Sequence, residues 1–309
     1  MTNNTTATPN KRARADDLID QFTSFRAELD QSQAQRERIV KTSRDITALS
    51  KQMIFALHRV SSGKDWNAVK REVEQKLKDL RTLFAKIQDE VKGQDFWRYE
   101  RSISPGLQEY LEGFTFYHYL EHRTLPTLEQ CQASLLPPPP APSTGEPTAQ
   151  EATTLESSLE EQGDEIERRP YVVVTPEDYL GGVADLTGEL MRLAIASVGK
   201  SLNSSLRTTS TTTGEGEEEE GSFADIDKIG RLVREIKGQM DPLAPYARWL
   251  SKKLVVLDQS LAKIENASYN LKIRGAEYKD SPRMLQELAK NLASSSTTGM
   301  DRGANEIGA

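Results

Sequence analysis

The chain has 309 residues, of which 36% are hydrophobic and 28% are charged, and its net charge is −7. This length suffices for one large domain or two small ones, and no apolar run approaches the roughly 18–20 residues of a membrane span. A single cysteine, Cys131, excludes an internal disulfide framework and a cysteine-based zinc site. We therefore expect a protein of a reducing compartment, the cytoplasm or the nucleus.

The negative charge is concentrated in two segments that lack any core-forming pattern. Residues 141–170 hold eight acidic and two basic residues, and residues 201–221 hold five acidic residues and one basic residue. The remainder of the chain is therefore mildly basic, at about +3. The composition predicts a flexible acidic, proline-rich linker over residues 137–170 and a low-complexity insertion over residues 204–221.

Most of the remaining sequence has apolar residues spaced by three and four, which predicts amphipathic helices. Residues 1–15 lack this pattern and are predicted to be a disordered basic arm, in which KRAR at 11–14 is a weak nuclear-import signal or nothing. Thr175-Pro176-Glu177-Asp178 is a strong helix start, with a capping residue, proline at the first position and acids in the first turn. The predicted helices cover residues 16–60, 66–93, 95–123 with a disturbance near Pro105, 127–136, 176–199, 223–240 and 249–271.

No hairpin signal is present, so the expected fold is all-α: a bundle of about seven helices in a single domain over residues 16–291. The predicted linker and insertion interrupt this domain, and residues 292–309 are expected to be a disordered tail. Such bundles often build metal sites from carboxylates on facing helices.

Two candidate metal patterns lie within LQEYLEGFTFYHYLEHR, residues 107–123. The louder one, His118-Tyr-Leu-Glu121-His122, has the H-x-x-E-H spacing of a zinc protease. At 100° per residue, both histidines and Glu121 fall in the same apolar stripe as Leu107. Packed or partly exposed histidines at the end of a core-facing helix are therefore favoured over a zinc hydrolase.

The quieter pattern is a pair of glutamates, Glu109 and Glu112, which lie on the face opposite that stripe. A solvated face is the simplest interpretation of such a pair. A second pair, Asp185 and Glu189, lies one helical turn apart in a segment that is otherwise almost uncharged. Two acidic pairs without partnering histidines suit Mg²⁺ or Mn²⁺ and phosphate chemistry. The second pair is flanked by small residues that would permit close approach by another helix or a ligand: Gly181, Gly182 and Gly188.

Basic residues along the first predicted helix fit a phosphate-bearing substrate. Each is most simply a solvated side chain, but together they could form an electrostatic track for a nucleic-acid backbone. The candidate RNA-binding residues are Arg36, Arg38, Lys41, Arg44 and Lys51.

Five long blocks stand out in the sequence: FRAELDQSQAQRERIVKTSRDIT, SKQMIFALHR, GLQEYLEGFTF, DYLGGVADLTGELMRLAIASVG and KKLVVLDQSLAKIENASYNLKIRGAE. Together they resemble the translin family, in the branch that holds the catalytic partners of translin. They are spread in order over residues 20–278 and miss both acidic segments and both tails. The resemblance implies a seven-helix subunit that joins translin in a hollow hetero-octamer, an Mg²⁺-dependent endoribonuclease acting on single-stranded or nicked RNA.

The resemblance also assigns roles to the acidic residues. The acidic motif of the family falls on Glu109, Glu112, Asp185 and Glu189, with Glu112 and Glu189 as the most direct metal ligands. Small-RNA passenger strands or transfer-RNA fragments are the implied substrates, and single-stranded DNA is a further nucleic-acid partner. A non-catalytic adaptor that stabilises translin and binds nucleic acid is the alternative, and it would leave the four carboxylates scattered.

Overall fold

The computed structural model describes residues 11–92, 96–136, 172–208 and 217–277, and isolated positions 281, 284 and 287. Side chains are described within residues 18–92, 96–136, 172–197 and 225–273, and at the three isolated positions. The predicted linker over residues 137–170 and the predicted tail over residues 292–309 lie outside the described residues.

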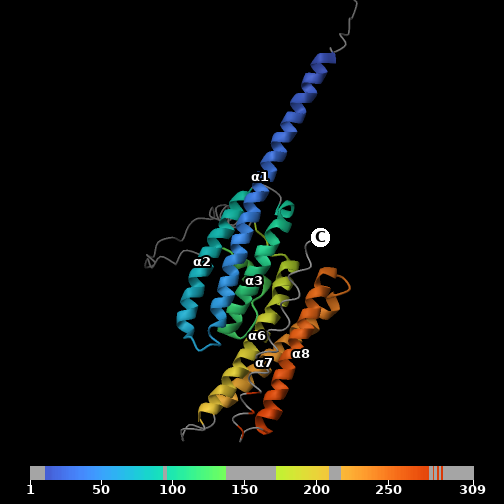
Figure 1. Cartoon of the computed structure of the whole chain (residues 1–309). Coiled ribbons are helices and arrows are strands. Elements are labelled where there is room, and N and C mark those ends of the chain that lie inside the picture. Colours follow the sequence, from blue (N-terminus) through green and yellow to red (C-terminus); the bar gives the residue numbers. More distant parts are fainter. Residues whose placement is uncertain are drawn as a thin grey trace, which may run out of the picture.

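The described part of the chain consists of seven α-helices and two short 3-10 helices, with no strand, which confirms the all-α prediction. Figure 1 shows α1, α2 and α3 running side by side, with α6, α7 and α8 forming the other half of the molecule. None of the described helices is long and apolar enough to cross a membrane. The elements are α1 (Lys11–His58), α2 (Trp66–Val91), η1 (Phe96–Arg98), α3 (Glu100–His122), α4 (Leu128–Ser134), α6 (Pro176–Thr208), α7 (Glu217–Met240), η2 (Asp241–Leu243) and α8 (Arg248–Glu277).

Several helix boundaries differ from the sequence-based expectation. Helix α1 begins at Lys11, within the segment predicted to be disordered, and its N-terminal part projects beyond the bundle (Figure 1). Helix α6 continues to Thr208 and α7 begins at Glu217, so helix covers both ends of the predicted insertion. The residues at these two ends are polar but include no proline, which would break a helix. A helix that the core already anchors can therefore continue into such a polar stretch.

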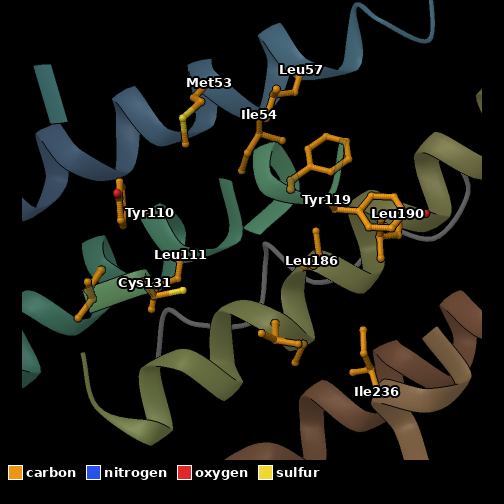
Figure 2. Packing of buried hydrophobic residues seen from close by; sticks show 14 of the residues in the cluster. Met53, Ile54, Leu57, Tyr110, Leu111, Tyr119, Cys131, Leu186, Leu190 and Ile236 are labelled. Carbon is orange, nitrogen blue, oxygen red and sulfur yellow. The ribbon is translucent and has the colours of Figure 1, made fainter. Parts of the chain in front are cut away.

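Helix α3 is the centre of the bundle, because it packs against α1 on one side and α6 on the other. It runs unbroken through Pro105, where a disturbance was predicted. Gly106 and Gly113 bring α3 close to α1, since an added Cβ would come within 2.6 Å of the Ser43 carbonyl oxygen and 2.4 Å of the Met53 Cε, respectively. Figure 2 shows side chains of three helices meeting in the core: Met53, Ile54 and Leu57 of α1, Tyr110, Leu111 and Tyr119 of α3, and Leu186 and Leu190 of α6.

The segment before α6 is extended and held by a single glutamine of α4. The Gln132 side-chain amide donates to the Val172 carbonyl oxygen at 3.0 Å, and its oxygen accepts from the Val174 amide at 2.7 Å. The two contacts imitate one rung of a β-ladder, and both valines are buried. This anchor returns the chain to the bundle at the point where α6 begins.

Helix α6 is fixed against α3 at its first turn. The Thr175 hydroxyl accepts from the Asp178 amide at 3.0 Å, which confirms the predicted helix start. The buried Asp178 carboxylate accepts hydrogen bonds from the Ser104 hydroxyl and, at 3.0 Å, from the Gln108 side-chain amide, both on α3. These contacts set the register of α6 on α3, on which the position of every later α6 side chain depends.

Candidate acidic metal site

Four carboxylates from α3 and α6 gather between the two helices; we call Glu109, Glu112, Asp185 and Glu189 the acidic cluster. The Glu112 carboxyl lies close enough to Glu189, Asp185 and Glu109 for the charges of all three to act on it. Burial increases inward across the cluster, because 39% of the Asp185 side chain is exposed but only 6% of the Glu189 side chain. The two pairs predicted from the sequence therefore form one site.

The close approach of α6 to α3 depends on two small residues. A Cβ added at Gly182 would lie 2.6 Å from Leu111 Cβ and 3.2 Å from the Glu112 backbone nitrogen, and a Cβ at Gly181 would lie 2.9 Å from the Gln108 side chain. These contacts confirm the close approach predicted for Gly181 and Gly182. Gly188 differs, because nothing lies within 4 Å of the position its Cβ would take.

Burial and mutual repulsion change the acidity of the cluster. Burial, reinforced by the neighbouring charges of Glu189, Asp185 and Glu109, raises the pKa of Glu112 to about 9. Burial likewise raises the pKa of Glu109, although the Lys51 ammonium opposes this shift. Glu112 is therefore neutral in the absence of a cation. A cation bound beside it would favour its ionised form, whose oxygens could then act as ligands.

Glu189 is held in its ionised form by two partners. The His58 Nε2 atom lies 2.5 Å from Glu189 Oε2, and the Arg192 guanidinium donates to Glu189 Oε1 at 2.6 Å. Burial alone would raise the pKa of Glu189, but the hydrogen bond from His58 and the charge of Arg192 outweigh it and lower that pKa. Both oxygens of this carboxylate are thus fixed in orientation.

Two lysines complete the electrostatics at the edge of the acidic cluster. Lys253 of α8 donates to Asp185 Oδ2 at 2.5 Å, and Lys51 of α1 lies 3.7 Å from Glu109 Oε2. The Lys51 side chain is 65% exposed, so this long contact is a loose ion pair. The site therefore draws its acids from α3 and α6 and its cations from α1, α6 and α8.

The donor chemistry of the acidic cluster fits a hard divalent cation. Mg²⁺ prefers carboxylate and water oxygens, and its charge would oppose the burial and the repulsion that raise the pKa of Glu112. Among the described residues, however, no three or more His, Cys, Asp or Glu side chains already converge as a set of metal ligands. Metal binding would require the carboxylates of Glu109 and Asp185 to turn from their lysine partners.

Sequence reasoning found the four acids but misjudged their surroundings. The face of α3 that carries Glu109 and Glu112 is covered by α6, so these side chains are half-buried and not on a solvated face. Phe116 on that same face is fully buried, which is the signal that a second partner helix covers it. The partners His58 and Lys253 were missed, because only tertiary docking brings α1 and α8 to the cluster.

The side chains of the HYLEH pattern, residues 118–122, contact other residues of the chain. His118 Nδ1 contacts the Thr124 carbonyl oxygen at 2.9 Å, and 54% of the His122 side chain is exposed. The Glu121 carboxylate accepts a hydrogen bond from the Lys70 ammonium, which holds the pKa of that carboxyl below its usual range. The interpretation of packed and partly exposed histidines agrees with this arrangement.

The predicted basic track is divided by the structure. Arg38 forms a bidentate pair with Glu90 of α2, at 2.7 and 2.9 Å, and therefore faces away from the acidic cluster. Lys51 lies at the cluster through its contact with Glu109. The remaining candidates, which are exposed on α1, are Arg36, Lys41 and Arg44.

Comparison with known proteins places the chain in a family. The Translin family profile matches residues 34–275. Translin-associated protein X of Mus musculus is 38% identical over 262 residues, covering 83% of this chain and 79% of the mouse protein. The Translin-associated protein X homolog of Schizosaccharomyces pombe is 26% identical over 266 residues, covering 84% of this chain and 90% of the yeast protein.

A solved structure described as apo-NeC3PO shares 16% identity, covers 85% of this chain and 98% of its own, and has a TM-score of 0.48. That similarity is too low to carry an argument about the site. The family match, by contrast, spans more than half of the chain, and the mouse relative is similar over most of its own length. The chain therefore belongs to the translin family.

Proposed function

We propose that this chain is the catalytic subunit of an Mg²⁺-dependent endoribonuclease that assembles with translin and cleaves single-stranded or nicked RNA. The observation that carries the proposal is the proximity of Glu112 to Glu189 and Asp185, whose charges act on its carboxyl, so that two acidic pairs from different helices share one place. Bringing four carboxyl groups together in a partly buried place costs free energy. That the fold nevertheless keeps them together supports a functional role for them. The name of the mouse relative, Translin-associated protein X, supports translin as the partner.

Glu112 and Glu189 would hold the metal directly, with Glu109 and Asp185 completing the acidic cluster. Bound Mg²⁺, or Mn²⁺ in its place, would supply an activated water and neutralise charge on the phosphodiester. His58 and Arg192 fix the Glu189 carboxylate, so this ligand needs little reorganisation.

The lysines at the edge of the cluster would position the substrate. Lys51 is held only loosely by Glu109, and its exposed ammonium can turn to a backbone phosphate. Lys253 pairs with Asp185 and could likewise turn to a phosphate oxygen of the substrate. The Asp185 carboxylate would then be free to face a metal. We propose small-RNA passenger strands or transfer-RNA fragments as substrates, and the cytoplasm and nucleus as the sites of action.

Cleavage by the assembled complex tests the proposal. The chain is co-expressed with translin, and a 5′-labelled single-stranded RNA is incubated with the complex in Mg²⁺ or in EDTA. We expect cleavage only with the metal, and loss of at least 100-fold in rate for Glu112→Gln/Glu189→Gln with assembly unchanged, since removing one electrostatic contributor already costs about that much.

The matched control is Glu121→Gln, which neutralises a glutamate of the same helix that lies outside the acidic cluster. This variant should cleave at the wild-type rate. Undiminished Mg²⁺-dependent cleavage by the double variant would reject the assignment of the site. A wild-type complex that binds RNA without cutting it under any metal would instead establish the adaptor function.

A further inference from the structure

An exposed phenylalanine lies on α1 between the two residues of this helix that contact the acidic cluster, Lys51 and His58. Phe55 is 73% exposed, although Met53 and Leu57 two residues to either side are completely buried. An aromatic ring left in water forgoes the favourable free energy of its burial. We therefore ask what the Phe55 ring contacts in the working complex.

The helical register places Phe55 between two residues of the site. Lys51 precedes it by four residues and His58 follows it by three, so the three side chains share a sector of about 60° on α1. Lys51 contacts Glu109, and His58 contacts Glu189. The ring of Phe55 thus lies within about one helical turn of both side chains that α1 sends to the acidic cluster.

The same sector of α1 carries a further cation on the side that leads away from the site. Arg44 is exposed and precedes Lys51 by seven residues, which is two helical turns or about 10 Å along the axis. An exposed aromatic ring beside spaced cations has the composition of surfaces that bind single-stranded nucleic acid, where the cations follow phosphates and the ring stacks on a base.

We propose that Phe55 is a stacking platform for an unpaired base of the RNA strand that enters the acidic cluster, with Lys51 and Arg44 holding the adjoining phosphates. The proposal rests on the nuclease function proposed above. Stacking on a side chain requires an exposed base face, which a base inside a duplex lacks. Phe55 is therefore a specificity residue that selects single-stranded RNA without taking part in the chemistry.

Binding measurements on the complex with translin test this role apart from cleavage. Fluorescence anisotropy in EDTA gives the affinity for an unstructured RNA oligonucleotide and for a series in which one nucleotide at a time is abasic. We expect Phe55→Ala to weaken binding of the intact RNA roughly 5- to 150-fold, the usual value of one base–aromatic stack. Phe55→Trp should bind like the wild type.

The abasic series supplies the specific readout. At one position, removal of the base should weaken binding to the wild-type complex and leave binding to Phe55→Ala unchanged, since the two changes remove the same contact. The control is Tyr269→Ala, which removes a 60% exposed ring of α8, sixteen residues beyond Lys253 and about 24 Å along the helix. This variant should retain wild-type affinity.

Two outcomes would overturn the stacking proposal. One is unchanged RNA affinity in Phe55→Ala; the other is loss of assembly with translin, which would show that a protein partner covers the ring. Cleavage assays in Mg²⁺ separate this proposal from the nuclease function. If Phe55→Ala binds RNA more weakly but the wild-type complex never cleaves it, the stacking proposal stands and the nuclease function is rejected. If Phe55→Ala cleaves RNA normally with unchanged KM, the nuclease function stands and the stacking proposal is rejected.

Discussion

The His58 Nε2 atom lies 2.5 Å from Glu189 Oε2, joining the last residue of α1 to the middle of α6 across 131 residues of sequence. The imidazole ring also packs against Phe116 of α3, with ring centroids 4.9 Å apart. One side chain therefore contacts both helices that carry the acidic cluster. We regard it as a positioning residue that sets the orientation of the Glu189 carboxylate.

Replacing His58 should reduce activity in a way that depends on the hydrogen bond. We expect His58→Ala to lower kcat/KM about 10- to 100-fold, the usual effect of losing a residue that orients a metal ligand. His58→Gln, which can place an amide nitrogen near the Nε2 position, should recover part of this loss. The exposed His122 provides the control, and His122→Ala should behave as the wild type. Equal activity of His58→Ala and His58→Gln would argue against an orienting hydrogen bond.

The protonation of Glu112 should make the stability of the metal-free complex depend on pH. The pKa of Glu112 rises from its usual 4.5 to about 9 on folding. The contribution of the neutral carboxyl to the free energy of unfolding is therefore present below pH 4.5 and is lost as the pH rises through 9. Glu112→Gln stays neutral, so its Tm advantage over the wild type should grow from pH 5 to pH 9.

Calorimetry in EDTA at pH 5, 7 and 9 measures this difference. Each kcal/mol should change Tm by roughly 2–4 °C in a chain of this size. Glu235→Gln is the matched control, because it removes an exposed carboxylate of α7. A Tm difference between Glu112→Gln and the wild type that is constant with pH would contradict the raised pKa.

Close packing of α6 on α3 should be sensitive to a single methyl group. Gly182→Ala places its Cβ 2.6 Å from Leu111 Cβ, which forces the helices apart at a cost of about 1–3 kcal/mol. We expect lower Tm and weaker cleavage, since the shift separates Glu112 from Asp185. Gly188→Ala on the same helix meets open space and should stabilise the chain by roughly 0.4–1 kcal/mol. Identical effects of the two substitutions on Tm would refute this packing argument.

Magnesium should stabilise the folded complex through the acidic cluster. Binding to the folded state alone contributes about 2.7 kcal/mol when the free metal is 100 times its Kd. The Tm should rise with Mg²⁺ for the wild type and stay constant for Glu112→Gln/Glu189→Gln. Sodium chloride at matched ionic strength separates this effect from screening. A rise of equal size in the double variant would place the metal elsewhere.

The sequence predicts the parts of this site that depend on local pattern. The start of α6 at Thr175 follows from capping chemistry, and the close approach at Gly182 follows from the absence of a side chain. Helical spacing likewise pairs Glu109 with Glu112. Such features need only a helix of known register.

The residues that sequence reasoning missed depend on how helices dock. Nothing in the pattern around His58 or Lys253 distinguishes it from the many other polar residues at helix ends and surfaces. Each becomes part of the site only because α1 and α8 pack against the acidic helices. The burial of Glu112 has the same origin, since Phe116 marks a second apolar face of α3 but does not say which helix covers it.

The position of Lys253 on the last described helix has a consequence for synthesis of the chain. When synthesis has reached Met240, all four carboxylates have been made, but Lys253, whose ammonium pairs with Asp185, has not. Until α8 docks on α6, three acids and a protonated Glu112 share the site without their full set of counter-charges. The acidic cluster therefore has all of its partners only when the fold is complete. We expect a chain truncated before α8 to be a poor nuclease even though every acidic residue is present.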